Sequence, residues 1–330
     1  LTLKNMIKNY FKVTMRNLFK HKFQSLLNII CLAIGMASIL IIFAYVKYEF
    51  SYDKFNKNSD RIFRVERHVV ETSGVDGYSA LQVGPLGPEL KTDCSEINDY
   101  TRIYQNESPL VVRYKDKMSL VNAEGACWVD ASFLAIFDCI LLKGDKNALT
   151  ELNTIVLTES VASSYFGKDD PLGKSIMIDN VVYRVTGICA DAPQNTHFHY
   201  KYLLSYGTLI NTPGYEWLGG WRGGGVFLYV KLNPDFNKVT LENKVLDVYK
   251  KYVNINFPNI LKFDLILRPI TDIHLHCEEG AQLESNTDIK LIRLIFITAI
   301  FILLISLVNA INLATSKSLE RAKEVGIRKV

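Results

Sequence analysis

Charged residues are missing from two long stretches of this 330-residue sequence. No Asp, Glu, Lys or Arg lies between Lys22 and Lys47, and none lies between Arg293 and Lys317. Each gap has about the ~20 apolar residues that a helix needs to cross the hydrocarbon core of a bilayer. The gaps argue against a purely soluble enzyme and predict two transmembrane helices, at residues 23–47 and 289–316.

The first apolar run is too long for a signal peptide, whose apolar core has only ~7–15 residues. The run from Phe23 to Val46 has 24 residues. The triplet Ala33-Ile34-Gly35 could pass for a cleavage site, but eleven more uncharged residues follow it. We therefore expect a span that is retained.

Acidic residues are missing from residues 1–22, which hold six Lys and Arg. The last stretch, 317–330, is also basic, whereas residues 48–288 hold 24 Lys and Arg against 32 Asp and Glu. Short basic segments stay on the cytoplasmic side of a membrane, so the pattern predicts an in–out–in topology with residues 48–288 outside. An acidic middle also argues against a nucleic-acid partner. Within residues 1–22 the cations recur at every fourth position, which predicts an amphipathic basic helix lying on anionic lipid.

The middle region has the interleaved pattern of an α+β domain. Periodicity predicts strands at 61–70, 99–104, 110–114, 154–157, 175–178, 181–188, 226–232 and 263–267. It predicts helices at 85–92, 131–137, 159–166 and 238–253, with Asp130 and Thr158 as N-caps and Gly167 as a terminating glycine. Seven glycines within 206–225 suggest a second lobe at about 206–260. We expect a two-lobed domain, a mixed sheet with packed helices, inserted between the two spans.

Cysteine is scarce, with six residues in the chain. Five of them fall in the middle region, and an odd number cannot all pair: Cys94, Cys127, Cys139, Cys189 and Cys277. A region of this size can bury a sufficient core without cross-links, so no disulfide is predicted.

Catalytic and nucleotide-binding motifs are also missing. No G-x-S-x-G sequence is present. Residues 167–175 resemble a phosphate-binding loop, but five residues separate the glycines instead of four, and two of the five are Asp. A strand-like run follows where that motif needs a helix. We expect no enzyme activity in this chain and no cofactor.

Two histidine pairs invite a metal site, because residues two apart on a strand share a face. They are His197 with His199 and His274 with His276. Neither pair has a carboxylate or second cysteine at ligand spacing, so we expect hydrogen-bonded strand or turn residues and no metal. The unusual segment from Trp217 to Gly225 could be a flexible lip, but aromatic side chains anchoring a loop explain it more simply.

The tail of the sequence strongly resembles the FtsX-like permease family of ABC transporters. That family has an R-x-x-E-[IV]-G-[IV]-R segment after its second span, and six residues match it: Arg321, Glu324, Val325, Gly326, Ile327 and Arg328. Residues 45–65 resemble the segment after the first span of such permeases from Bacteroidetes-type bacteria. Residues 129–133, 142–145, 165–167 with 171–174, and 185–187 are similar to the MacB-like periplasmic core domain, which identifies residues 167–175 as a helix-to-strand turn.

The resemblance implies a non-catalytic permease subunit of the bacterial inner membrane. It implies at least four spans, so we expect this sequence to be a fragment that holds two. Its partners would be an ABC ATPase on a separate chain, a second permease subunit or half, membrane lipid and a periplasmic or outer-membrane protein. ATP-driven closure of two ATPases would move the spans and reshape the periplasmic domain.

The same resemblance places an ATPase-coupling segment at the cytoplasmic end of the second span. Its candidate residues are Glu320, Arg321, Glu324, Gly326, Arg328 and Lys329. Gly326 is a point where the helix could bend. Asn309 and Asn312 lie inside the span, where polar side chains usually hydrogen-bond to another helix.

A two-span receptor with a periplasmic ligand-binding domain is the alternative. Such a receptor has the same topology, but a long coiled coil would continue its second span. The run from Glu324 to Ile327 breaks that heptad pattern.

Overall fold

The computed structural model describes residues 6, 7, 12, 16, 22–72, 74, 76–106, 108–122, 125–221, 224–253, 260–276 and 281–327. The chain divides into two compact units. One unit comprises Leu1–Phe50 and Ile289–Val330, and the other comprises Ser51–Asp288.

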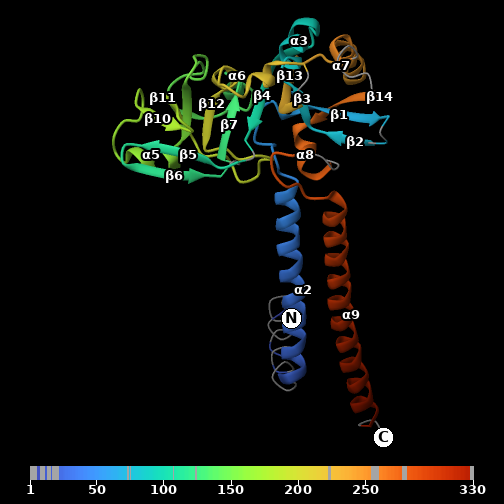
Figure 1. Ribbon diagram of the computed structural model, residues 1–330. Coiled ribbons are helices and arrows are strands. Elements are labelled where there is room, and N and C mark those ends of the chain that lie inside the picture. Colours follow the sequence, from blue (N-terminus) through green and yellow to red (C-terminus); the bar gives the residue numbers. More distant parts are fainter. Residues whose placement is uncertain are drawn as a thin grey trace. The chain divides into compact units, whose positions relative to one another are not determined.

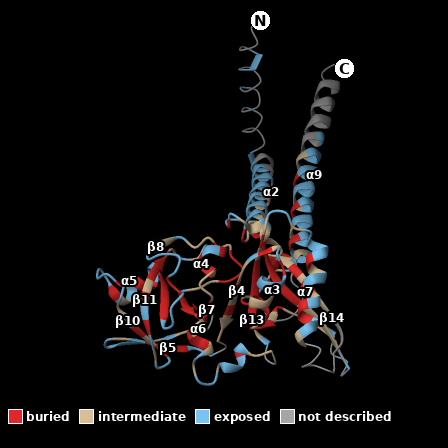
Figure 2. Cartoon of the chain, turned by 90° about the horizontal axis from the view of Figure 1, so that it is seen from above, coloured by how far each residue is buried: buried red, intermediate tan, exposed pale blue. Residues whose placement is uncertain are grey.

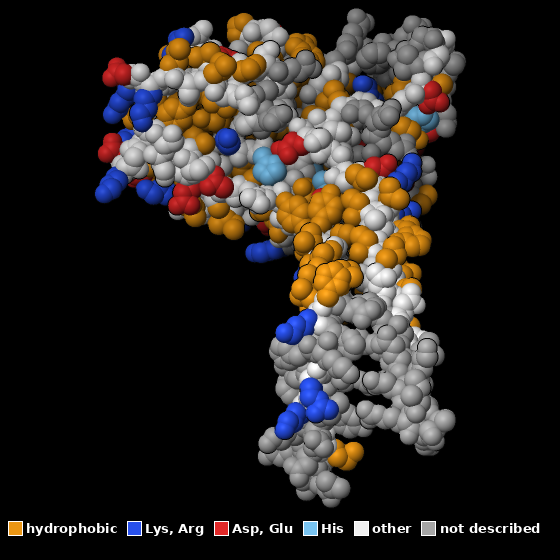
Figure 3. Space-filling model, turned by 90° about the horizontal axis from the view of Figure 1, so that it is seen from below, with side chains coloured by type: hydrophobic (Ala, Val, Ile, Leu, Met, Phe, Trp, Pro, Cys, Tyr) orange, Lys and Arg blue, Asp and Glu red, His pale blue; other side chains and the backbone are white. Residues whose placement is uncertain are grey.

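The first unit contains two long apolar helices that pack on each other, α2 (Lys22–Glu49) and α9 (Ile289–Ile327). Two of their segments, Ile29–Glu49 and Ile289–Asn312, are long and apolar enough to cross a membrane. Large apolar side chains are exposed along both helices, as the orange surface in Figure 3 shows. Ile41, for example, is 69% exposed. Such a surface is stable in lipid, where every backbone group must bond within the helix.

The second unit is built on one mixed sheet, fourteen-stranded in its described part (Figure 1). Its main path runs β14-β1-β13-β4-β7-β12-β9-β11-β10-β5-β6, with β2 beside β1, β3 beside β13 and β8 beside β11. β9 and β11 are parallel, as are β7 and β12, and the other pairs are antiparallel. The predicted α+β domain with a mixed sheet is confirmed.

The elements of this unit follow one another with short connections. The strands are β1 (Ile62–Glu71), β2 (Asp76–Ser79), β3 (Leu81–Val83), β4 (Ile97–Gln105), β5 (Leu110–Tyr114), β6 (Lys117–Val121), β7 (Ala126–Val129), β8 (Leu141–Lys143), β9 (Thr154–Thr158), β10 (Ser175–Ile178), β11 (Val181–Cys189), β12 (Tyr202–Ser205), β13 (Gly224–Leu232) and β14 (Ile260–Pro269). The helices are η1 (Ser59–Arg61), α3 (Leu86–Asp93), α4 (Phe133–Ile136), α5 (Glu159–Phe166), α6 (Tyr206–Ile210), η3 (Glu216–Gly219), α7 (Lys238–Val253) and α8 (Ile270–His276).

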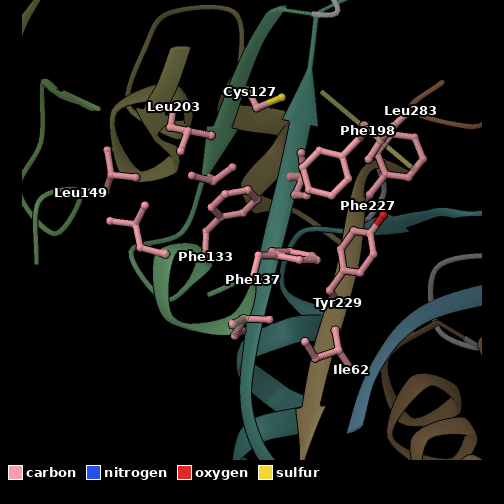
Figure 4. Close-up of a cluster of buried hydrophobic side chains, with 14 of the residues drawn as sticks. Ile62, Cys127, Phe133, Phe137, Leu149, Phe198, Leu203, Phe227, Tyr229 and Leu283 are labelled. Carbon is pink, nitrogen blue, oxygen red and sulfur yellow. The ribbon is translucent and has the colours of Figure 1, made fainter. Parts of the chain in front are cut away.

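The core lies on both faces of this sheet, because successive side chains of a strand point to opposite sides. On β7, for example, Cys127 belongs to the cluster on one face and Trp128 to a cluster on the other. Phe133 of α4 and Phe137, which directly follows this helix, pack on the first face, where the Phe137 and Tyr229 rings lie 5.2 Å apart (Figure 4). α5 covers part of the opposite face, and α3 and α7 cover the end with β14 and β1. Figure 2 shows buried residues along these strands.

Every predicted strand and helix of the middle region is present, but several elements were not predicted. They are β2, β3, β6, β7, β8, β12, α6 and α8. One cap was wrong: Ser132, not Asp130, precedes α4, and the Asp130 carboxylate instead accepts hydrogen bonds from the Arg102 guanidinium. The segment 206–260 does not stand apart as a lobe, because β13 lies inside the sheet between β1 and β4.

The glycine-rich loop is anchored to the core by Leu218, which is 1% exposed. The Tyr206 hydroxyl donates a hydrogen bond to the Leu218 carbonyl oxygen. Gly84 permits this contact, because a Cβ built at Gly84 would lie 1.9 Å from the same oxygen. The loop is anchored, but the anchor is the aliphatic Leu218 and not the predicted aromatic Trp217, which is 46% exposed.

Four cysteines of the described domain are free thiols: Cys94, Cys127, Cys139 and Cys189. Burial raises the pKa of Cys127 and Cys189 to about 12, and that of Cys94 and Cys139 to about 11. Cys277 lies outside the described residues. Because the thiolate is the reactive form, these pKa values imply inert thiols.

We expect Gly84→Ala to destabilise the domain by about 1–3 kcal/mol, because the loop backbone would have to move. Gly219→Ala is the matched control: it lies in the same loop, nothing lies within 4 Å of its added Cβ, and it should change stability by only about 0.5 kcal/mol. Thermal unfolding followed by near-UV circular dichroism tests both. Equal melting temperatures for the two variants would contradict the packing described.

We also expect the thiols to resist modification in the native chain. In a chain carrying Cys31→Ser and Cys277→Ser, an aromatic disulfide reagent at pH 8 should react slowly before unfolding and with all remaining cysteines after it. Raising the pH toward the raised pKa values should speed the native reaction, since more thiolate forms. Rapid native labelling, or missing thiols after unfolding without reductant, would be incompatible with free buried cysteines.

Candidate functional site

The candidate site lies where the chain enters and leaves the domain. We name three segments: the leading segment (Ser51–Asn56), which directly follows α2, the trailing segment (residues 281–288), which directly precedes α9, and the clamp segment (Asn195–His199). The clamp segment lies between β11 and β12 and is bonded to both of the others. The leading and trailing segments, by which the chain enters and leaves the domain, are thereby held at one place.

Backbone and side-chain hydrogen bonds join the leading segment to the clamp segment. The Asp53 amide donates to the Asn195 carbonyl oxygen at 2.9 Å. Asn195 Nδ2 donates to the carbonyl oxygen and hydroxyl of Ser51, at 3.0 and 3.1 Å. Asp53 Oδ1 accepts from the Thr196 hydroxyl at 3.1 Å and from the His197 amide at 3.4 Å. Asp53 has φ 58°, a left-handed conformation that Asp tolerates better than most residues.

His197 connects this junction to the centre of the sheet. Its Nδ1 lies 2.9 Å from Asp53 Oδ1, and its Nε2 lies 2.7 Å from the Tyr229 hydroxyl on β13. Both partners of the His197–Asp53 pair are almost completely buried, with side chains 0% and 1% exposed. A buried carboxylate is stable only with partners of this kind, so the leading segment is fixed to the core.

The trailing segment is held by the other end of the clamp segment. The Glu284 carboxylate accepts a hydrogen bond from the His199 amide, and both of its oxygens lie 2.9 Å from His199 Nδ1. The hydrogen bond with Glu284 raises the pKa of His199. This pair is partly exposed, so its strength depends on pH and salt more than that of the buried pair.

His274 on α8 is a second residue that contacts both the leading and the trailing segment. Its ring stacks on Tyr52 of the leading segment with a centroid separation of 3.4 Å. Its carbonyl oxygen accepts a hydrogen bond from the Thr287 amide of the trailing segment at 3.0 Å. Of the histidines considered as metal ligands, His197, His199 and His274 thus have other contacts, and His276 is exposed. No group of three ligands occurs among the described residues.

The two long helices approach each other closely at one pair of small residues. A Cβ built at Gly35 of α2 would lie 2.3 Å from the hydroxyl oxygen of Ser306 on α9, so the helices approach closely there. Ser306 also donates to the Ile302 carbonyl oxygen of its own helix at 2.9 Å. Asn309 and Asn312 are exposed on α9 in this chain. Small residues at such contacts are typical of packed membrane helices.

Four of the six candidate coupling residues lie near the end of α9. The helix continues through Glu320, Arg321, Glu324 and Gly326 to Ile327, and it does not end at Gly326. Arg328 and Lys329 lie outside the described residues, as do the side chains of the other four.

The loop that resembled a phosphate site is a turn from α5 to β10, as predicted. Gly167 ends α5 with φ 62°, and Ser175 begins β10. Its lysine is engaged by a carboxylate, because Lys174 Nζ lies 3.0 Å from Asp169.

The family model of the MacB-like periplasmic core domain matches residues 25–248. The macrolide export ATP-binding/permease protein MacB of Aggregatibacter actinomycetemcomitans is 22% identical over 334 residues, covering 98% of this chain and 48% of that protein. The protein of the same name from Wolinella succinogenes is 20% identical over 188 residues, covering 54% of this chain and 28% of that protein. The chain thus spans less than half the length of these relatives.

A solved domain of a permease protein from Porphyromonas gingivalis has a similar fold. Its TM-score is 0.56 at 20% identity, and the match covers 72% of this chain and 98% of that domain. The similarity in fold agrees with the family match, which includes α2 and the domain as far as α7. Since the match extends over more than half of the sequence, the chain belongs to the MacB-like periplasmic core domain family.

Proposed function

We propose that this chain is the permease part of an ABC transporter of the MacB type. Residues 23–47 and 289–316 would span the inner membrane, and residues 48–288 would lie in the periplasm, as the basic ends and acidic middle favour. An ATPase on another chain would supply the energy, and a second permease copy would complete the assembly. Two observations support the proposal: the family match, and the hydrogen bonds that hold both the leading and the trailing segment to the clamp segment.

The attachment suggests how movement would pass from the membrane to the domain. α2 continues directly into the leading segment, and the trailing segment continues directly into α9. A displacement of either span would pull on the clamp segment, which is tied to β13 through His197 and Tyr229. Asp53 Oδ1 accepts bonds from both Thr196 and His197, and leaving a buried polar group without its partner costs about 1–3 kcal/mol, so the junction would move as one piece.

The exposed positions on the helices are consistent with further spans. Asn309 and Asn312 are exposed on α9 in this chain. We propose that their side chains hydrogen-bond to helices of the remaining permease. The basic end of α9 would then reach the ATPase.

We expect Asn195→Ala to weaken coupling, because it removes both side-chain hydrogen bonds to Ser51 while leaving the buried Asp53–His197 pair. The loss of stability should be about 1–2 kcal/mol, small enough for the domain to remain folded. In the full permease reconstituted with its ATPase, ATP-driven function should fall several-fold while assembly is unchanged. Asn211→Ala, which removes only a local bond to Gly207, is the control. Wild-type function in Asn195→Ala would exclude this junction as the transmission point.

We also expect Arg328→Glu, Glu324→Lys and Gly326→Pro to uncouple the permease from its ATPase. A charge reversal at an interface sets like charges together, and Pro removes a backbone donor and breaks the helix. Lys146→Glu, the same charge reversal on the exposed domain surface, should have no effect. Co-purification with the ATPase and substrate-dependent ATP hydrolysis are the measurements. If all three variants behave as wild type, the tail only sets topology and the two-span receptor becomes the better hypothesis.

A further inference from the structure

A groove of about 810 Å³ lies at the β6 end of the domain, apart from the leading segment. It runs between strand β6 on one side and helix α5 on the other, which Figure 1 shows together with β5 at one end of the sheet. Its base is formed by the beginnings of β7 and β12. The volume is within the range of pockets that bind ligands, roughly 300–1,000 Å³.

Strand β6 borders the groove with its edge, not with one face. Four consecutive residues, 119–122, line the groove. Successive side chains of a strand point to opposite faces, so consecutive residues can all border one cavity only where it lies beside the backbone. β6 is the terminal strand of the sheet path and pairs, among the described strands, with β5 alone. Its outer edge therefore offers backbone N–H and C=O groups to the groove.

This edge has few of the features that protect terminal strands from pairing. Such strands usually carry charges, proline or a bulge. β6 has the sequence KMSLV, with one charge and no proline, and its register with β5 is regular. Met118 and Leu120 are each 70% exposed and share one face, so the strand presents apolar side chains next to an open edge.

The rest of the groove lining is mostly polar, and Lys201 at the base adds a positive charge. Ser160 and Ser164 of α5 line it, and the Tyr165 hydroxyl contacts Ser119 across the groove. At the base, Lys201 is exposed and makes no ion pair among the described residues. His199 and Glu284 also line the groove, and they are paired with each other.

We propose that the groove binds an extended segment of a partner protein, which adds to the sheet as a strand beside β6. Residues 119–122 provide about 10 Å of edge at ~3.3 Å per residue, enough for a few strand residues. In an added strand, alternate side chains would continue the apolar face of Met118 and Leu120, and the others would point toward α5 and Lys201. The segment is therefore one that alternates apolar residues with acidic or small hydroxyl residues, a form of strand addition.

This proposal goes beyond the permease function and does not depend on it, because binding is tested in the chain alone. The groove adjoins the junction of the clamp and trailing segments, because His199 and Glu284 belong to that junction and also line the groove. A segment bound there would contact the clamp between the domain and the trailing segment.

The test uses the full chain in lipid nanodiscs and a fluorescent, capped peptide of alternating Val and Asp. We expect binding at about 1 mM or below, with slower hydrogen exchange at the amides of residues 119–122. Ser164→Trp, which fills the groove, should weaken binding at least about tenfold. Ser163→Trp, the exposed neighbour on α5 outside the groove, should not.

A charge exchange tests the orientation of the peptide. Lys201→Glu should weaken binding of the Val–Asp peptide by about tenfold, and it should bind a matching peptide of Val and Lys more tightly than wild type does. The control Lys168→Glu should change the binding of neither peptide. The proposal is overturned if the peptide does not bind, if Ser164→Trp binds it as well as wild type, or if exchange is slowed elsewhere and not at 119–122. It is also overturned if β6 pairs with a second copy, seen as a dimer that Ser164→Trp dissociates without any peptide.

Discussion

The buried carboxylate of Asp53 is the constraint on which the junction depends. A buried carboxylate oxygen needs donors, and Asp53 Oδ1 receives them from Thr196 and His197, more than 140 positions later in the chain, whereas Oδ2 has no donor among the described residues. The same contacts place His197 next to β13, where its second ring nitrogen, Nε2, lies within hydrogen-bond distance of the Tyr229 hydroxyl. The contacts of Asp53 and His197 thus fix the start of the domain, the loop before β12 and the middle of the sheet to one another.

Much of the fold could be predicted from local pattern. α5 and β10 were predicted with their observed bounds, because a helix ended by Gly167 and a short alternating strand carry their own signals. β7 and β12 were missed because both faces of these strands are buried: their sequences, ACWV and YLLS, lack the alternation of apolar and polar residues that marks a half-buried strand. Periodicity detects a difference between two faces, and these strands have none.

The candidate site was less predictable, since its contacts join distant positions. The sequence indicated that His197 and His199 are hydrogen-bonded and not metal ligands, but it could not name Asp53 and Glu284 as their partners. In the helices, the composition pointed to Asn309 and Asn312 as contact residues. That stays a prediction about helices of the remaining permease; within this chain the close contact uses Gly35 and Ser306, because the smallest side chains let two backbones approach.

The contact between Gly84 and Leu218 has a consequence for the divergence of related sequences. With the Leu218 oxygen 1.9 Å from the place of a Cβ, the turn before α3 and the glycine-rich loop cannot vary independently. A relative with any side chain at this position must have a loop of different path, and a loop transplanted from such a relative would not fit here. We therefore expect the two segments, more than 130 residues apart, to change together among related sequences.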